Sequence, residues 1–193
     1  MTTEQTKYII QILTDKGVHF DSGLTDDEVL QVETKFKFKI PPDLKLFLQT
    51  GLPTSDQFVN WRLGLSSISE AEKILERLNR PLEGMLFDIQ FNNFWVDSWE
   101  GKPDKFDKQA EIAKKHYLAY PSLIPIYSHR YIPSMPNENR NPIFSVSQMD
   151  IIYFGYDLPT YFANEFHFAL TNNFDLLDKP VKQIEFWSRI AED

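Results

Sequence analysis

A complete start signal for an α-helix lies in the stretch Leu24-Thr-Asp-Asp-Glu-Val29. The Thr25 hydroxyl can accept a hydrogen bond from the Glu28 backbone amide, while the Glu28 carboxylate can accept one from the Thr25 amide. Leu24 and Val29 flank this capping box and can pack on each other as a hydrophobic staple. The pattern therefore predicts a helix that begins directly after Thr25.

Two further helices are predicted, one on either side of the first. Apolar residues recur at helical spacing over residues 7–13, and Gly17 suits the left-handed conformation that ends many helices. Pro42 is tolerated in a first helical turn because its missing N–H has no partner there, so a third helix is expected from Pro42 to about residue 48, before Gly51. Three helices therefore open the chain.

Strand patterns are concentrated in the middle and late parts of the chain. The short apolar segment 61–65 has the flanks of a strand. Segment 123–127 is expected to be an edge strand, because Pro125 cannot donate to a central ladder. Segments 143–146 and 150–154 flank a tight connection, which predicts a β-hairpin.

Helices are expected between and after these strands. They are predicted from a Ser67 or Ser69 cap to about Leu78, from an Asp104 cap to Tyr117, from Asp157 to Phe168, and over residues 181–190. Helices that come first and strands that come later are typical of the α+β class. The expected fold is a single domain, residues 1–193, with a central, mainly antiparallel sheet surrounded by helices.

Length and composition agree with one globular domain. The chain has 193 residues, 42% of them hydrophobic, which is enough for a core without covalent staples. Because it contains no cysteine, a disulfide framework, a thiolate metal site and a cysteine nucleophile are excluded, and a reducing compartment such as the cytoplasm is expected. The first residues lack the basic and apolar regions of a signal peptide, and no apolar run is long enough for a membrane span.

The charge balance of the chain is acidic. Lys and Arg number 20 against 28 Asp and Glu, which gives a formal net charge of −8. Nucleic-acid binding depends on clustered basic side chains, so we expect no nucleic-acid partner, and the sequence indicates no membrane partner either. An acidic surface suits simple solubility or a basic protein partner.

Motifs for catalysis and metal binding are absent from the sequence. The histidines His19, His116, His129 and His167 lack the spacing of metal ligands. Neither a glycine-rich phosphate loop nor a nucleophile elbow occurs. We therefore expect no enzyme activity, no metal and no cofactor.

Five segments along the chain form an ordered series. Segments 24–33 and 40–51 make a helix, proline, helix pattern, segment 94–103 is rich in tryptophan and ends in proline, and segments 125–133 and 141–155 follow. In this order they resemble the SUKH superfamily, which includes the Smi/Knr cell-wall-assembly regulators of fungi and many bacterial immunity proteins. The resemblance spans residues 24–168, and the N-terminal and C-terminal helices are expected to pack on that core.

The resemblance implies an α+β domain that acts by binding. A bacterial member would bind and neutralise a polymorphic toxin, often a nuclease, so the implied partner is a basic toxin domain. A regulatory scaffold like the fungal members, which would bind cellular proteins, is the alternative. The resemblance leaves the oligomeric state open.

One late segment of the chain is locally acidic. There is no Lys or Arg between Asn141 and Asp178, and the acids near or within these bounds are Asp150, Asp157, Glu165, Asp175 and Asp178. These carboxylates can form a surface that meets a basic toxin. In the alternative interpretation, Asp157 caps a helix and the others are solvated.

A second group of candidates surrounds two tryptophans. Trp95 and Trp99 are candidate interface anchors, because tryptophan is enriched in binding hot spots. A carbohydrate-active protein would instead use Asp97 and Glu100 as paired carboxylates beside them. Arg130 is expected to pair with a carboxylate such as Asp150 and so fix its loop. The candidate partner-binding residues are therefore Trp95, Asp97, Trp99, Glu100, Arg130, Asp150, Asp157 and Glu165.

Overall fold

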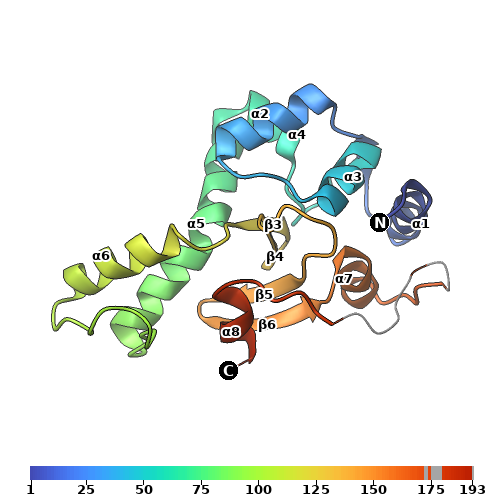
Figure 1. The fold of residues 1–193 in the computed structure, drawn as a ribbon. Helices are drawn as coiled ribbons and strands as arrows, with labels where there is room; N and C mark the ends of the chain where they lie inside the picture. The colour runs from blue at the N-terminus through green and yellow to red at the C-terminus, as the bar shows by residue number, and fades with distance from the viewer. Residues whose placement is uncertain (172–173, 175–179, 193) are drawn as a thin grey trace.

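The computed structural model describes residues 1–171, 174 and 180–192, and in this part of the chain it forms an α+β body (Figure 1). The elements are α1 (Thr3–Asp15), β1 (Phe20–Ser22), α2 (Asp26–Phe36), α3 (Pro42–Thr50), β2 (Gly51–Pro53), α4 (Trp61–Ser66), α5 (Ile68–Phe91), α6 (Phe106–Tyr117), β3 (Leu123–Tyr127), β4 (Arg130–Pro133), β5 (Ile143–Ser147), β6 (Asp150–Gly155), α7 (Leu158–Glu165) and α8 (Trp187–Glu192).

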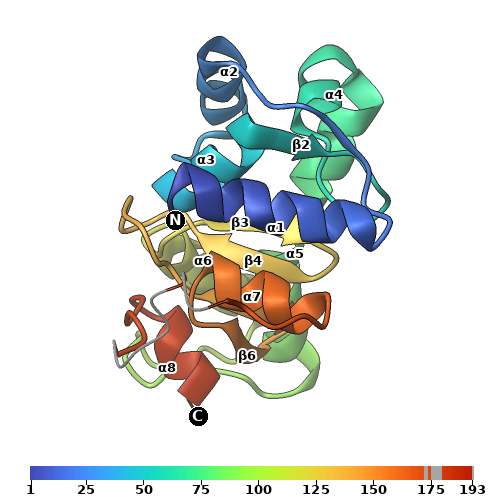
Figure 2. The same ribbon diagram turned by 90° about the vertical axis from the view of Figure 1, so that its right-hand side faces the viewer.

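A four-stranded antiparallel sheet lies at the centre, in the order β3-β4-β5-β6. Two-residue turns join β3 to β4 and β5 to β6, with Ser128 at φ 47° and Gln148 at φ 57°. Figure 2 shows α2 and α4 at one end of the molecule and α8 at the other, with the sheet between them. The α+β class and the antiparallel central sheet that the sequence predicts are confirmed.

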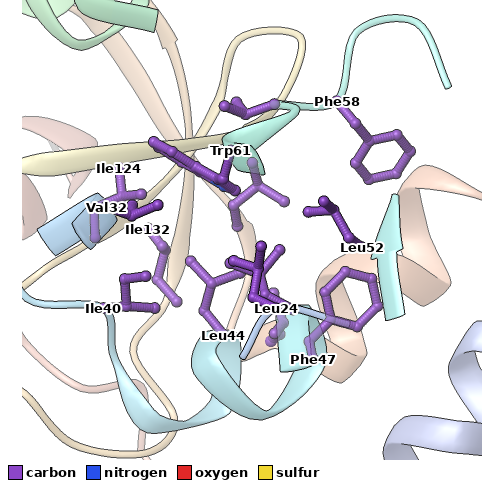
Figure 3. Close-up of a cluster of buried hydrophobic side chains, with 14 of the residues drawn as sticks. Leu24, Val32, Ile40, Leu44, Phe47, Leu52, Phe58, Trp61, Ile124 and Ile132 are labelled. Carbon is purple, nitrogen blue, oxygen red and sulfur yellow. The ribbon is translucent and has the colours of Figure 1, made fainter. Parts of the chain in front are cut away.

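Each face of the sheet covers its own hydrophobic core, because successive residues of a strand point to opposite faces. Ile124 and Ile132 belong to a first core with α1–α4 and α7, part of which Figure 3 shows. Leu123 and Tyr131 belong to a second core with α5, α6 and α8. In the first core, the Trp61 ring meets Phe36 and Phe38 edge-on, at centroid distances of 5.7 and 5.6 Å.

The helix starts predicted at Thr25 and Pro42 are confirmed, whereas α1 begins at Thr3, earlier than the expected range 7–13. The Glu28 amide donates to Thr25 Oγ1 at 3.1 Å, and the Thr25 amide donates to Glu28 Oε2 at 2.8 Å. Pro42 is the first residue of α3, as expected. α2 ends at Phe36, before the Pro41-Pro42 pair, and its C-cap Lys37 adopts a left-handed conformation with φ 61°.

The strand expected over residues 61–65 is wrong, because these residues form α4. Asn60 starts the helix by accepting a hydrogen bond on its side chain from the Leu63 amide at 3.0 Å. The buried residues Trp61 and Gly64 are three apart, which places them on one side of a helix but on opposite faces of a strand. Gly64 packs closely on α5: a Cβ there would lie 2.4 Å from Ile74 Cδ1, so the end of the Ile74 side chain would have to shift.

The helix expected to end near Leu78 continues to Phe91 as α5, with Pro81 inside it. The ring nitrogen of Pro81 cannot donate to the Arg77 carbonyl, four residues earlier. The Tyr131 hydroxyl donates to that carbonyl instead, at 3.0 Å. A side chain from the central sheet thus replaces the missing helical hydrogen bond, and this explains why a proline that predicts a break is tolerated.

Several other boundaries differ from the expectation. Asp104 does not cap α6, whose N-cap is Lys105 and which has no side-chain cap. Arg130, expected to lie in a loop, is the first residue of β4, which pairs with β3 and β5. α7 begins after its Asp157 cap, as predicted, but ends at Glu165 rather than at Phe168. α8 begins only at Trp187 rather than near residue 181, because Phe186 has φ 67°. β3 is an edge strand, as predicted.

We predict that Tyr131→Phe lowers the free energy of unfolding by about 1–3 kcal/mol, because it leaves the Arg77 carbonyl without its donor. The cost should be smaller in a Pro81→Ala background, where the restored backbone amide at this position can donate to the same carbonyl. Urea denaturation of the two single variants and the double variant measures this coupling. An equal cost of Tyr131→Phe in both backgrounds would contradict it.

A second prediction concerns Gly84, where α5 touches the β5–β6 turn. A Cβ at this position would lie 2.6 Å from the backbone Cα of Gln148. Gly84→Ala should therefore destabilise the protein by about 1–3 kcal/mol, despite the better helix propensity of alanine. Gly101→Ala is the control, since its Cβ would meet nothing within 4 Å. Stabilisation by Gly84→Ala in a thermal unfolding assay would refute this packing argument.

Candidate functional site

The eight candidate residues fall into two separate groups. Trp95, Asp97, Trp99 and Glu100 lie in the connection between α5 and α6, which we call the tryptophan loop (residues 92–105). The other four, Arg130, Asp150, Asp157 and Glu165, lie on β4, β6, the N-cap of α7 and α7 itself. Trp99 packs in the second core, whereas Arg130 packs on Phe154, which lies against the first core.

The tryptophan loop is closed by its own two tryptophans. Trp99 is buried, and its indole N–H donates to the Tyr120 hydroxyl at 2.8 Å. Trp95 is half-buried and donates to the Glu100 carbonyl at 3.0 Å. The two rings meet edge-on, with centroids 5.1 Å apart and planes at 87°. Trp99 is therefore a core anchor, and Trp95 offers only part of its ring to solvent.

Glu100 is held by two side chains of α6. Its carboxylate lies 2.7 Å from Lys115 Nζ and 2.6 Å from His116 Nε2. The hydrogen bond from Lys115, followed by that from His116, lowers the pKa of Glu100 to about 2. The His116 ring also stacks on Trp99, with centroids 5.3 Å apart. This cluster fastens the tryptophan loop to α6.

This geometry weakens the interpretation of Asp97 and Glu100 as a glycosidase pair. A catalytic general acid needs a raised pKa, whereas the pKa of Glu100 is lowered. Trp99 is buried, so it cannot stack on a sugar. Asp97 is exposed, and no ion pair holds it among the described residues. The loop can present Trp95 and Asp97 to a partner.

Arg130 does not pair with Asp150, contrary to the expectation. Its Nε donates to Glu165 Oε2 at 2.8 Å and its Nη1 donates to Ser145 Oγ at 2.7 Å, while the guanidinium lies 3.7 Å from the centroid of the Phe154 ring. The sheet register explains the difference, because Arg130 lies opposite Ser145, whereas Asp150 pairs with Ser147 at the hairpin turn. Arg130 therefore joins β4 to α7.

His129 completes this cluster on the β3–β4 turn. Its Nδ1 lies 3.0 Å from the Ser128 hydroxyl, and its Nε2 contacts Arg130 Nη1. Burial, and then the charge of Arg130, lower the pKa of His129. The neutral imidazole is favoured, so no additional positive charge faces the Arg130–Glu165 pair.

The acidic segment forms a less acidic surface than its sequence implies. Asp157 accepts from the Thr160 amide at 3.0 Å, which confirms that it caps a helix, and its carboxylate lies 3.8 Å from Arg140 Nε. Glu165 is neutralised by Arg130. Asp150 is exposed and has no ion pair among the described residues. Asp175 and Asp178 lie outside those residues.

Several exposed apolar side chains on the helices were not predicted from the sequence. Phe87 and Phe91 on α5 are exposed, and their rings lie 4.8 Å apart. Leu30, Leu63 and Ile68, on α2, α4 and α5, are also exposed. The sequence shows that these residues are apolar. Helical periodicity does not show which side of a helix is left uncovered by the other elements of the fold.

The residues that the structure describes provide neither a cluster for a metal ion nor a helix for a membrane span. No group of three or more His, Asp or Glu side chains there is placed to hold a metal ion. None of the described helices combines the length and the apolar character needed to cross a membrane.

No protein-family model, curated protein or solved structure matches the chain. The likeness to SUKH proteins therefore rests on the ordered segments of the sequence. These segments correspond to α2 and α3, the tryptophan loop, and the strands β3–β6.

The Glu100 cluster predicts a pH dependence of stability. Its pKa is lowered from 4.5 to about 2 in the folded protein, so the ion pairs stabilise the fold fully above about pH 4.5 and lose this effect as the pH falls towards 2. Glu100→Gln should therefore destabilise the protein at pH 7 and progressively less below pH 4.5.

Urea denaturation of wild type and Glu100→Gln at pH 7, 5 and 3.5 tests this expectation. Asp97→Asn is the matched control, because Asp97 is an exposed acid of the same loop that no described side chain holds in an ion pair. A difference between wild type and Glu100→Gln that stays constant from pH 7 to pH 3.5 would show that the ion pairs do not stabilise the fold.

Proposed function

We propose that the chain is a non-catalytic binding protein of the SUKH type, an immunity protein that neutralises a toxin domain in the bacterial cytoplasm. One observation carries the proposal: the segments that resemble SUKH proteins form successive parts of one α+β body. The helix, proline, helix pattern forms α2 and α3, with Pro42 at the first position of α3. The last two segments contribute the antiparallel strands β3–β6.

Neutralisation would be steric and electrostatic. A toxin that acts on nucleic acid presents a basic surface to phosphates, and a protein of net charge −8 is attracted to that surface. Opposite charges raise the rate of encounter, and the bound protein then excludes the substrate. No catalytic group of this chain is needed for either step.

A regulatory scaffold related to the fungal cell-wall-assembly regulators is the second candidate. It would use the same kind of surface on a cellular protein rather than on a toxin. The exposed aromatic side chains Phe87 and Phe91 suit either partner, since large aromatic groups dominate binding interfaces. The two functions differ in whether the protein protects cells from a toxin.

Protection of a bacterial host tests the immunity function. Candidate toxin domains are taken from the reading frames beside the gene for this chain and expressed with or without it. We expect growth to be restored for one of them, and the two proteins to purify as a complex. If no neighbouring product is toxic, or if toxicity persists despite expression of folded protein, the immunity function is wrong.

The same complex tests the contribution of Asp150. Asp150→Lys removes the exposed carboxylate on the β5–β6 hairpin, so the association rate should fall several-fold at low ionic strength and approach wild type in high salt. Asp56→Lys makes the same change of charge at an exposed site outside both candidate groups and serves as the control. Asp157 is unsuitable for this test because it caps α7. Equal rates for both variants would exclude a specific role of Asp150.

A further inference from the structure

Exposed apolar side chains gather on α2, α4 and the first half of α5. Four large hydrophobic residues there are exposed to solvent: Leu30 by 57%, Leu63 by 43%, Ile68 by 81% and Leu75 by 43%. Figure 1 shows α2, α4 and the start of α5 next to one another at one end of the molecule. Exposed apolar residues mark an interaction site where they form one contiguous patch, whereas single ones are ordinary.

A groove of about 400 Å³ lies at this end of the molecule. It is lined by Leu30, Gln31, Thr34 and Lys35 of α2 and by Leu65 of α4. Lys35 Nζ donates to the Gly64 carbonyl at 2.7 Å, which ties the end of α2 to α4. The aliphatic part of Lys35 is thereby held as one wall of the groove, with Leu30 and Leu65 as its apolar sides.

Two further exposed apolar side chains lie on the first half of α5. Leu65 precedes Ile68, the first residue of α5, by three positions. Ile68 and Leu75 are seven residues apart and so lie on one side of the helix, about 10.5 Å apart along its axis. Side chains at positions i and i+7 of a second helix have the same separation, so such a helix can contact Ile68 and Leu75 together.

Exposed carboxylates border this apolar surface. Asp27 lies one turn before Leu30 on α2, and Glu72 and Glu76 lie one turn apart beside Leu75 on α5. All three are exposed, and no ion pair holds them among the described residues.

The cations of α4 and α5 nearby are paired: Arg62 with Glu28 at 2.5 Å and Lys73 with Glu70 at 2.6 Å. Lys35 is bonded to a neutral carbonyl and keeps its positive charge in the groove. The three unpaired carboxylates Asp27, Glu72 and Glu76 therefore leave an excess of negative charge over Lys35 on this surface.

We propose that this α2–α4–α5 surface (Asp27, Leu30, Leu65, Ile68, Glu72, Leu75 and Glu76) binds a basic amphipathic α-helix of a protein partner. Apolar side chains of the helix at positions i, i+3, i+4 and i+7 enter the groove and cover Ile68 and Leu75. Its Lys and Arg side chains meet the three carboxylates. The proposal rests on the proposed function and deepens it, because it names the part of the toxin domain that is bound.

The probe is a fluorescein-labelled peptide of leucine and lysine, about 16 residues long so that it forms roughly four helical turns, with leucine at i, i+3, i+4 and i+7. A peptide of the same composition in scrambled order has the same charge but no apolar side. We expect the amphipathic peptide to bind at least ten-fold more tightly than the scrambled one, measured by fluorescence anisotropy. Leu30→Ser with Ile68→Ser should abolish this difference.

The charged part of the surface is tested separately. Glu72→Lys with Glu76→Lys should weaken binding of the amphipathic peptide at least ten-fold at low salt and less at high salt. Two matched controls lie elsewhere on the molecule: Leu118→Ser removes an exposed apolar side chain, and Asp104→Lys with Asp107→Lys reverses two exposed acids. Both controls should bind as wild type does, and circular dichroism verifies that every variant is folded.

Three outcomes would overturn the proposal. Equal binding of the two peptides would show that no apolar recognition occurs. Unchanged binding by the Leu30 and Ile68 double variant would place the site elsewhere. A dimer that the same variant dissociates, seen by light scattering, would identify the occupant as a second copy of the chain.

The docking surface and the proposed function can fail independently. If the protein protects cells from a toxin and the Leu30 and Ile68 double variant protects equally well, the surface is wrong while the function stands. If the peptide binds as expected but no toxin is neutralised, the surface stands and the partner is a different basic protein.

Discussion

The attachment of α5 to the two hairpin turns of the sheet is the constraint on which the other elements depend. The Arg77 guanidinium donates to the carbonyls of Gln57 and Ser128 at 3.1 and 2.9 Å, and the Arg77 carbonyl accepts from Tyr131. One helical turn past Gly84, the buried Asp88 carboxylate accepts from the Met149 amide at 2.8 Å. Because α5 contributes residues to both cores, these contacts fix the two faces of the sheet relative to each other.

The same attachment explains why the candidate residues divide into two groups. α5 carries the tryptophan loop past its C-terminal end, where Trp99 enters the second core. Arg130 leaves β4 on the opposite face, where it is almost covered by Glu165 and Phe154. The two groups thus serve different faces of one sheet. A single binding surface composed of all eight candidates is incompatible with this arrangement.

Local signals in the sequence predicted the parts of the fold that local interactions determine. The capping box at Thr25, the proline at the start of α3, the Asp157 cap and the β5–β6 hairpin each depend on neighbours within a few residues. The continuation of α5 through Pro81 could not be predicted in this way, because the donor that replaces the missing amide comes from Tyr131, which follows Arg77 by 54 positions. The pairing of Arg130 likewise depended on the register of β4 against β5, which its own segment does not specify.

The distribution of free charge on the surface likewise could not be predicted from the sequence. The net charge of −8 follows from composition alone, but a carboxylate attracts a partner only to the extent that the fold leaves it unpaired. Glu28 is paired with Arg62, Glu100 with Lys115 and His116, and Glu165 with Arg130. Of the described carboxylates between residues 141 and 171, only Asp150 remains unpaired, and it lies near the exposed Ile152 on β6, whereas α2 and α5 carry three unpaired carboxylates, Asp27, Glu72 and Glu76, near exposed apolar groups. Electrostatic steering requires unpaired carboxylates, and docking requires exposed apolar side chains at the same place. This is the physical reason to look for the partner at the end of the molecule formed by α2, α4 and the start of α5.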